Sequence, residues 1–393
     1  MRYDAVVIGG GPSGSAVATA LARQGRAVAI VERSEFPRSK VCGEFISAVN
    51  LALLDRLGVG DSIRALAGPE IRRVALFAGG TGIEAKMPRA PTNAFGRALG
   101  RDVLDTLLLE AAAEAGATVL QPWQAVDAVP DGDDMAVHVE CKDEQRTLVA
   151  PIVVAAHGSW EPGGLPSQMK KRHQPSDFLG FKAHFRDSSL PPDLMPLLAF
   201  PGGYGGMVWS DQGRMSISCC IRRDRLAQVR AEHSGMAAGE AVFRHILAAC
   251  PGVAEALRHA RLDGSWLAAG PIRPGLRAAY ADDIFRVGNI AGESHPIIAE
   301  GISMALQSGW LLAGELARVP DWNRAGRRQA GLRYAAAWRR QFAVRILTAS
   351  ALAGLASRPL TAGAMHQFVR AFPASLFLGA QLSGKISVVP GLG

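Results

Sequence analysis

The segment YDAVVIGGGPSGSAVATALARQGRAVAIVE, residues 3–32, carries the most informative pattern in the chain. Residues 3–8 are mostly apolar, which predicts a buried strand, and residues 14–24 place alanines at helical packing positions. Residues 27–32 predict a second buried strand. A strand, a glycine-rich turn, a helix and another strand form a βαβ unit. We therefore expect an α/β fold whose parallel sheet begins near the N-terminus.

The turn between this first strand and its helix has the composition of a dinucleotide-binding loop. Gly9 permits the tight turn, Gly11 lets the backbone approach a pyrophosphate, and Gly14 lets the helix pack closely on the strand. Pro12 suits the first helical turn, where its missing N–H costs little. Glu32 ends the second strand, where a carboxylate can accept the ribose hydroxyls. Together these features predict dinucleotide binding rather than a simple tight turn.

A second glycine-rich, strand-to-helix turn lies at residues 285–308. The strand is expected to end at Gly288, and Asn289 can hydrogen-bond a ribityl hydroxyl or a phosphate. Gly301 and Ile302 are expected at the start of the next helix. The positive end of that helix would stabilise the negative charge that reduction places on a flavin ring. This second turn narrows the prediction from a dinucleotide to FAD.

The remainder of the chain predicts a nucleotide-binding domain that is interrupted in sequence. Strand-like segments between residues 178 and 221 predict an antiparallel sheet, residues 158–174 read as a linker, and the chain is mostly helical after Pro320. We expect a Rossmann-like, discontinuous FAD-binding domain with an inserted antiparallel-sheet substrate domain and a C-terminal helical region. The first part of the FAD-binding domain would also hold minor substrate-domain strands near residues 70–95. We expect the first part of the FAD-binding domain at residues 1–174 and the substrate domain at residues 175–265. The second part of the FAD-binding domain would follow at residues 266–320, and the helical region at residues 321–393.

Composition and charge exclude several classes of protein. The 393 residues are 48% hydrophobic and 20% charged, which is typical of a soluble globular enzyme. The net charge of +8 comes without a dense basic run and interleaved aromatics, so nucleic acid is not an expected partner. Five cysteines without CxxC spacing predict neither a zinc nor an iron–sulfur site. No uncharged apolar run of about 18 residues is present, so cytoplasm is the expected location, with peripheral membrane contact left open.

The loop at residues 36–44, FPRSKVCGE, follows the βαβ unit and carries positive charge. Arg38 and Lys40 can neutralise phosphate. Cys42 can be a small apolar packing residue near the flavin ring or a reactive thiol. The packing role is favoured because no base is paired with Cys42 in sequence.

Taken together, these motifs resemble the FAD-dependent oxidoreductase superfamily of aromatic hydroxylases, geranylgeranyl reductases and flavin-dependent halogenases. The similarity is greatest to the geranylgeranyl-reductase-like branch and covers roughly residues 1–320. It rests on the first glycine turn with Glu32, on residues 42–44, on the helix start at residues 101–105, and on the second turn with Pro296. The resemblance implies that Arg101 and Val126 also contact FAD, the latter through its backbone. The complete set of expected FAD contacts is Gly9, Gly11, Pro12, Ser13, Gly14, Glu32, Arg33, Lys40, Cys42, Gly43, Arg101, Val126, Asn289, Gly301 and Ile302.

The chain departs from the family pattern at two positions. Asn289 stands where the family usually has aspartate, and His157-Gly158 stands where many members have Asp-Gly. In hydroxylases of the family, that second aspartate assists the binding of both FAD and a nicotinamide cofactor. The electrons would therefore come either from NADPH or from a separate flavin reductase.

Three side chains are candidates for chemistry beside the flavin, namely His295, Tyr204 and Cys42. His295 would serve as a proton donor or base, or else cap a carbonyl in its loop. Tyr204 and Trp209 would form a wall of the substrate site, or else belong to the sheet core. Trp209 and the other tryptophans of this region stand singly rather than in the Trp-x-Trp-x-Ile motif of halogenases.

Two apolar helical stretches, at residues 342–356 and 368–382, dominate the C-terminal region. They would line a tunnel for a long apolar substrate, rest on a membrane surface, or form a helical cap on the FAD-binding domain.

These observations lead to one principal functional hypothesis and two alternatives. The principal hypothesis is an FAD-dependent monooxygenase that hydroxylates a small apolar or aromatic, secondary-metabolite-like substrate through a flavin C4a-hydroperoxide. The first alternative is a reductase that saturates prenyl double bonds of the geranylgeranyl type. The second is a non-catalytic flavin-binding protein.

Overall fold

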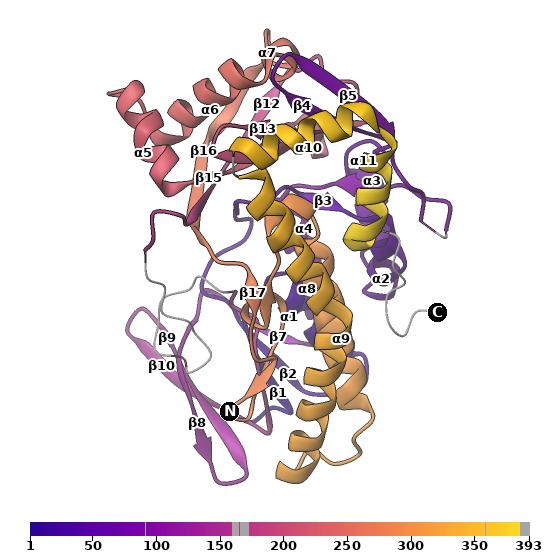
Figure 1. The fold of residues 1–393 in the computed structure, drawn as a ribbon. Helices are drawn as coiled ribbons and strands as arrows, with labels where there is room; N and C mark the ends of the chain where they lie inside the picture. Colours follow the sequence, from indigo (N-terminus) through magenta and orange to yellow (C-terminus); the bar gives the residue numbers. More distant parts are fainter. Residues whose placement is uncertain (91, 159–164, 166–172, 358, 386–393) are drawn as a thin grey trace.

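The computed structural model describes residues 1–90, 92–158, 165, 173–357 and 359–385 of the chain. A six-stranded sheet holds the predicted βαβ unit at its centre, with the strand order β18-β19-β11-β1-β2-β7 (Figure 1). All neighbouring strands pair in parallel except β18 and β19. The strands are β1 (Ala5–Ile8), β2 (Val28–Val31), β7 (Thr118–Leu120), β11 (Ile152–Ala155), β18 (Tyr280–Ala281) and β19 (Ile284–Arg286).

Helices pack on one face of this sheet. The helix α1 (Pro12–Ala22) is buried along its whole length and contacts α4 (Arg101–Glu114) and α8 (Gly301–Ala317). The crossing of α1 and α8 is close, because a Cβ added at Gly309 would lie 2.4 Å from the Ser13 carbonyl oxygen. The first helix thus begins at Pro12, two residues before the predicted start.

A three-stranded antiparallel sheet covers the other face. Its strands are β8 (Gln124–Asp131), β9 (Asp134–Cys141) and β10 (Glu144–Ala150), and Val137, Val139 and Leu148 pack against β1 and β2. The sequence of residues 118–129 predicts one strand, and this prediction is wrong. The chain divides there into β7 and β8 around Pro122, which has no N–H to donate to a ladder.

A separate seven-stranded sheet forms the second large layer, with the order β16-β12-β15-β14-β13-β4-β5. Its pairs are antiparallel except β4 with β13, which run in parallel. Its strands are β4 (Arg73–Ala78), β5 (Thr81–Lys86), β12 (Phe178–Arg186), β13 (Leu194–Phe200), β14 (Gly203–Trp209), β15 (Met215–Arg222) and β16 (Arg261–Ile272). Helices α5 (Arg223–Glu232), α6 (Ala238–Ala249) and α7 (Pro251–Ala256) share its apolar core.

The minor strands expected near residues 70–95 are β4 and β5, and they join this second sheet as expected. The strand β16 runs through the boundary expected between residues 265 and 266, so the division into four segments stays a prediction. Most of the expected linker at residues 158–174 lies outside the described residues. Short elements connect the two layers: β3 (Phe45–Ile46), β6 (Arg97–Ala98), β17 (Gly275–Leu276), β20 (Gly292–Glu293), α2 (Leu51–Arg56) and α3 (Gly60–Leu66).

The C-terminal region consists of the long helix α9 (Arg324–Ala356), then α10 (Pro359–Ala371) and α11 (Ala374–Ala380) with a π-helical turn at Gln381–Lys385. In Figure 1 these helices run along one side of the molecule, from the six-stranded sheet towards the seven-stranded sheet. Tyr334, Trp338, Phe342 and Ile346 of α9 pack into the core of the FAD-binding part, as a helical cap would. The second predicted helical stretch is divided, because Pro373 cannot continue α10. Within the described residues, no helix is both long and apolar enough to cross a membrane.

Candidate active site

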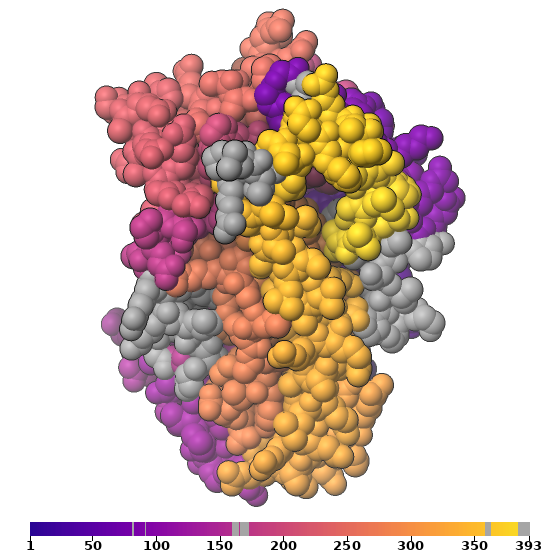
Figure 2. Space-filling view, in the orientation of Figure 1, coloured from indigo at the N-terminus to yellow at the C-terminus, as the bar shows by residue number. Residues whose placement is uncertain are grey.

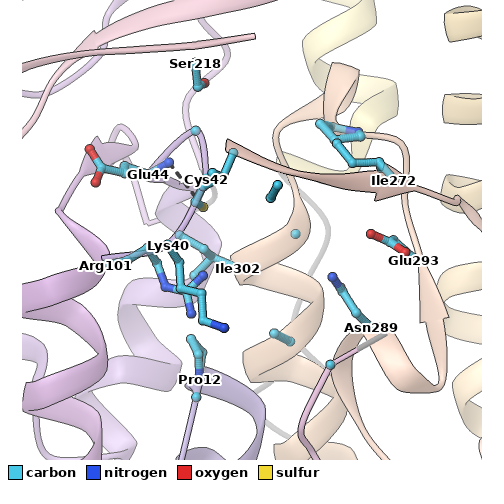
Figure 3. Close-up of a pocket in the computed structure, with 18 of the residues that line it drawn as sticks. Pro12, Lys40, Cys42, Glu44, Arg101, Ser218, Ile272, Asn289, Glu293 and Ile302 are labelled. Atoms are coloured by element: carbon cyan, nitrogen blue, oxygen red, sulfur yellow. Dashed lines mark hydrogen bonds between the residues drawn. The ribbon is translucent and has the colours of Figure 1, made fainter. Parts of the chain in front are cut away.

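One pocket of about 950 Å³ is lined by residues from both large sheets. At one end, which we call the glycine end, the wall comes from the turn after β1, from Glu32 and from the start of α8. At the other end, which we call the sheet end, strands β13 to β16 supply the wall. Of the expected FAD contacts, all but Gly14 and Val126 line this pocket. Figure 3 shows Pro12, Lys40 and Arg101 facing Asn289 and Glu293 across it.

The glycine turn has the backbone geometry that its sequence predicts. Gly9 has a φ of 111°, and an added Cβ would lie 2.8 Å from the carbonyl of Ala156 in the neighbouring strand. A Cβ at Gly14 would lie 1.9 Å from the Gly9 carbonyl oxygen, so this position packs the helix against the strand rather than lining the pocket. The Glu32 carboxylate accepts hydrogen bonds from the backbone N–H of Gly10 at 2.8 Å and of Ser34 at 2.9 Å. These two hydrogen bonds fix the position of the Glu32 carboxylate relative to the glycine turn.

Two other glycines line the pocket where the protein itself leaves space. An added Cβ at Gly11 would meet only Arg38 Nη2, at 3.7 Å, and one at Gly301 would meet nothing within 4 Å. Neither residue has a φ in the left-handed region. Neither protein packing nor backbone strain therefore requires glycine at these positions, whereas close approach of a bound dinucleotide would. This observation fits FAD at the glycine end.

The second glycine turn brings Asn289 to the pocket. Strand β19 ends at Arg286, two residues earlier than predicted, because Gly288 (φ 66°) begins the 3-10 turn Gly288–Ile290. The Gly288 N–H donates to Ser308 Oγ at 2.8 Å, which ties the turn to α8. The helix α8 starts at Gly301, as predicted. Gly301 and Ile302 line the pocket, so the free N–H groups of the first helical turn lie at the pocket wall.

A buried polar network that was not predicted holds the start of α8. Glu300 Oε1 accepts a hydrogen bond from Ser47 at 2.5 Å. Asn50 Nδ2 donates to Ser303 Oγ at 2.8 Å, and Gln307 Nε2 donates to Asn50 Oδ1 at 2.9 Å. The partners are about 250 residues apart in sequence, so no local spacing signals them. The network orients the helix end that the flavin prediction depends on.

The loop after β2 places Cys42 beside a cation. Arg101 donates to both carboxylate oxygens of Asp105 at 2.7 Å and also interacts with the Cys42 thiol. Burial alone would lower the pKa of Arg101, but Asp105 raises it above its ordinary value. The backbone N–H of Glu44 donates to Cys42 Sγ at 3.4 Å, as the dashed line in Figure 3 marks. Cys42 therefore has polar neighbours at the pocket wall, which the sequence did not reveal.

A buried charged cluster, Glu44 with Lys182 and His184, lies at the sheet end. Glu44 is fully buried and has a φ of 61°. Its carboxylate forms an ion pair with Lys182 and a 3.0 Å contact with His184 Nε2, both on β12. Burial would raise the pKa of Glu44, but the His184 hydrogen bond and the Lys182 charge lower it to about 2. This cluster joins the flavin loop to the seven-stranded sheet. The prediction had included Glu44 only as part of the family motif.

Two of the candidate catalytic residues form a buried pair. Tyr204 Oη and His295 Nδ1 share a hydrogen bond, and the ring centres of Phe178 and His295 lie 5.0 Å apart in an edge-to-face arrangement. Tyr204 lines the pocket, whereas His295 is behind it and is not among the lining residues. Burial lowers the pKa of His295 to about 4, so its ring is neutral at neutral pH. Burial raises the pKa of Tyr204 well above its ordinary value, which keeps its hydroxyl protonated.

The remaining candidates have different surroundings. Trp209 packs in the core of the seven-stranded sheet and donates from Nε1 to the Leu190 carbonyl at 2.8 Å, as the sheet-core alternative predicts. Val126 is exposed on β8, while its neighbours Gln124 and Ala125 line the pocket. Contact of Val126 with FAD therefore stays a prediction. The sequence predicts a helix over residues 103–116 with Asp102 as its cap, and both the start and the cap are wrong. The helix begins at Arg101, and Asp102 instead pairs with Arg214 at 3.0 Å.

Residues 2–349 match the protein family described as FAD binding domain. The chain belongs to this family. Its cofactor is FAD.

Individual relatives differ in name and in coverage. Conditioned medium factor receptor 1 of Dictyostelium discoideum is 25% identical over 82% of this chain and 64% of its own length. A menaquinone reductase of Mycolicibacterium smegmatis is 33% identical over 39% of this chain and 37% of its own length. Digeranylgeranylglycerophospholipid reductase 1 of Methanopyrus kandleri is 28% identical over 81% of this chain and 80% of its own length. The chain thus spans less than two thirds of the length of the first two relatives.

Solved structures share the fold at low identity. The myxobacterial chondrochloren halogenase has a TM-score of 0.74 at 20% identity, covering 87% of this chain and 80% of its own. A geranylgeranyl bacteriochlorophyll reductase-like protein of Thermoplasma acidophilum has a TM-score of 0.66 at 19% identity, and the match covers 91% of this chain and 92% of its own. The chain thus shares its fold with proteins named as a halogenase, a reductase-like protein and a probable monooxygenase, and its family match assigns it FAD.

Proposed function

We propose that this FAD-binding-domain protein is a reductase that saturates a carbon–carbon double bond of a long, apolar, prenyl-type substrate. The observation that carries the proposal is the apolar sheet end of the pocket, where Met195, Leu197, Met207, Val208 and Leu267 form the wall. Such a wall suits a hydrocarbon chain, which has no polar group for the protein to match. One relative matched along about four fifths of both lengths is named digeranylgeranylglycerophospholipid reductase, which supports the same class.

The chain's own residues would hold FAD at the glycine end. The backbone of Gly9 and Gly11 and the N-terminus of α1 would bind the pyrophosphate, and Glu32 would accept the ribose hydroxyls. The start of α8, at Gly301 and Ile302, would lie against the pyrimidine edge of the flavin. When bound and reduced by its electron donor, FAD would supply the two electrons of the reaction as a hydride.

Saturation of a double bond adds a hydride to one carbon and a proton to the other, so a side chain must hold a proton at the pocket wall. Tyr204 keeps its hydroxyl proton at neutral pH, because burial raises its pKa. Cys42 lines the same pocket and lies beside Arg101. We assign the proton-holding role to Tyr204, with the neutral His295 ring orienting its hydroxyl through their hydrogen bond.

The decisive experiment compares products formed with and without oxygen. The purified holoenzyme is reduced chemically without oxygen, and geranylgeranyl diphosphate or a phenolic compound is then added. The proposal predicts an anaerobic prenyl product that has gained two hydrogen atoms. An oxygen-dependent product that has gained one oxygen atom would instead establish the hydroxylase hypothesis and overturn this one.

The electron source is tested separately. Residue His157, which stands where many family members have aspartate, lines the pocket. We therefore propose that a separate reductase, rather than NADPH directly, reduces the flavin. Bleaching of the flavin absorbance by NADPH alone, at a rate matching turnover, would contradict this part of the proposal.

A further inference from the structure

The positive charge of the molecule is concentrated in its C-terminal region. Residues 322–393 contain ten arginine and lysine residues and no aspartate or glutamate. The other 321 residues contain 33 basic and 35 acidic residues, so they are close to neutral. The net charge of +8 therefore comes from the segment that forms α9, α10 and α11.

The second half of α9 is apolar on both sides. Phe342, Ile346, Ala349 and Ala353 point into the protein and are buried. On the opposite side, the exposed apolar side chains are Val344 (69% exposed), Leu347, Leu352 and Leu355. Arg340 is exposed one helical turn before Val344. A helix that is apolar all round is normally covered on both sides, by protein or by lipid. Among the described residues, no layer covers these four side chains of α9.

Helices α10 and α11 add to the same apolar region. Phe368 and Phe372 are exposed one turn apart, and their ring centres lie 5.4 Å from each other. Leu378 and Leu382 follow, also one turn apart and exposed. Among the described residues, eight of the fifteen exposed large hydrophobic side chains lie between residues 344 and 382. Figure 2 shows α9, α10 and α11 together on one face, and we call their exposed apolar and basic side chains the C-terminal surface.

We infer that the C-terminal surface docks on an anionic lipid bilayer, with its apolar side chains entering the interface and its arginines facing the headgroups. Exposed apolar side chains on helices with basic and no acidic residues are the combination that binds such a surface. A second copy of the chain is a poorer occupant. A twofold interface would bring this surface against itself, and its positive charges would meet no acidic partner.

The docking surface is continuous with the sheet end of the pocket at two points. Ala353 of α9 packs in one apolar cluster with Tyr204. Leu376 and Ala380 of α11 pack with Met195, which lines the pocket. If the proposed reductase function holds, an apolar substrate would pass from the bilayer into the pocket beside α11. The docking itself does not depend on that function.

Vesicle flotation of the holoenzyme tests the inference. The vesicles contain either phosphatidylcholine alone or phosphatidylcholine with phosphatidylglycerol, at low and at high salt. We expect binding to the anionic vesicles and its loss at high salt, because salt screens charges near the surface. Equal binding to both vesicle types, or none to the anionic vesicles, would overturn the inference.

Two pairs of variants separate the C-terminal surface from general stickiness. The triple change Leu347→Gln, Leu352→Gln and Leu355→Gln is expected to weaken binding about tenfold or more. The control Leu66→Gln with Leu262→Gln alters leucines of similar exposure elsewhere and should bind as the wild type does. Likewise, Arg339→Gln with Arg340→Gln should weaken binding about tenfold, whereas Arg230→Gln with Arg244→Gln on α5 and α6 should not.

The failure of docking and the failure of the reductase proposal give different results. Flavin content and turnover of a short, water-soluble prenyl substrate should be unchanged in the leucine variant. If that variant binds vesicles normally, the docking inference is wrong while the reductase proposal stands. If its only effect is to convert a dimer into a monomer in light scattering, a second copy covers this surface and the inference is also wrong.

Discussion

At the glycine end of the pocket, the turn after β1 and the start of α8 present backbone, because Gly9, Gly11 and Gly301 have no side chain. At the sheet end, the wall consists of side chains such as Met195 and Met207, supported by the buried ion pair of Glu44 and Lys182. A backbone wall binds FAD, which is the same molecule in every member of the family, so this wall tolerates little change. A side-chain wall can change residue by residue while the sheet beneath it stays the same. This difference is consistent with one fold carrying several reactions in the family.

The largest effect is expected from Gly14→Ala at the glycine end. The new Cβ would lie 1.9 Å from the Gly9 carbonyl oxygen, and this backbone clash cannot be relieved by a side-chain movement. We expect a protein that purifies without flavin absorbance or fails to fold. The control is Gly314→Ala in α8, where an added Cβ meets nothing within 4 Å, and it should keep its flavin. Normal flavin content in Gly14→Ala would show that the turn is not built as described.

The next effect is expected at the sheet end, from Glu44→Gln. This change leaves the Lys182 ammonium buried without its counter-charge, so the free energy of unfolding should fall by about 3 kcal/mol in denaturant titration. The double variant Glu44→Gln with Lys182→Met removes both charges and should recover part of that loss. A double variant that is no more stable than Glu44→Gln would argue against an ion pair between these residues.

The same ion pair predicts a pH dependence. The pKa of Glu44 is lowered from 4.5 to about 2 in the folded protein, so its contribution is fully present above pH 4.5. It should be lost as the pH falls from 4.5 towards 2, because protonation then favours the unfolded chain. Glu44→Gln should lack this component of acid unfolding. An identical acid profile for the variant and the wild type would contradict the assignment.

The glycine end and the sheet end of the pocket also differ in how well the sequence predicts them. The glycine turn and its βαβ unit are local in sequence, so their spacing predicts the elements and their order, although α1 begins at Pro12 rather than at Gly14. The Glu44 cluster and the network from Ser47 to Gln307 join residues more than 130 positions apart. Packing of residues 44–50 against β12 and α8 sets those contacts, and no local pattern encodes that packing. For the same reason Trp209 could not be assigned to wall or core before the sheet was known.

A smaller effect is expected from Tyr204→Phe. It removes the hydroxyl that pairs with His295, which should lower the free energy of unfolding by about 1–2 kcal/mol. Turnover of the prenyl substrate should fall much more than FAD affinity, because the proton-holding group is lost while the glycine end is unchanged. A parallel loss of FAD binding and turnover would indicate a structural role only.

The smallest effect is expected from Trp209→Phe, which tests whether the pocket wall at the sheet end includes Trp209. The change removes the hydrogen bond to Leu190 inside the sheet core and should cost about 1 kcal/mol of stability. Product distribution and turnover should match the wild type, since Trp209 does not line the pocket. A changed substrate preference would extend the sheet end to this residue.

The central claim, that the glycine end holds FAD, is tested most directly by titrating FAD into the apoprotein of Gly11→Ala and of Gly314→Ala. An added Cβ at Gly11 meets only Arg38 Nη2, at 3.7 Å, so the apoprotein should unfold at the wild-type temperature. The account predicts that Gly11→Ala binds FAD about tenfold more weakly or worse, a loss of roughly 1.4 kcal/mol, whereas Gly314→Ala binds it normally. Wild-type FAD affinity in Gly11→Ala would contradict the account.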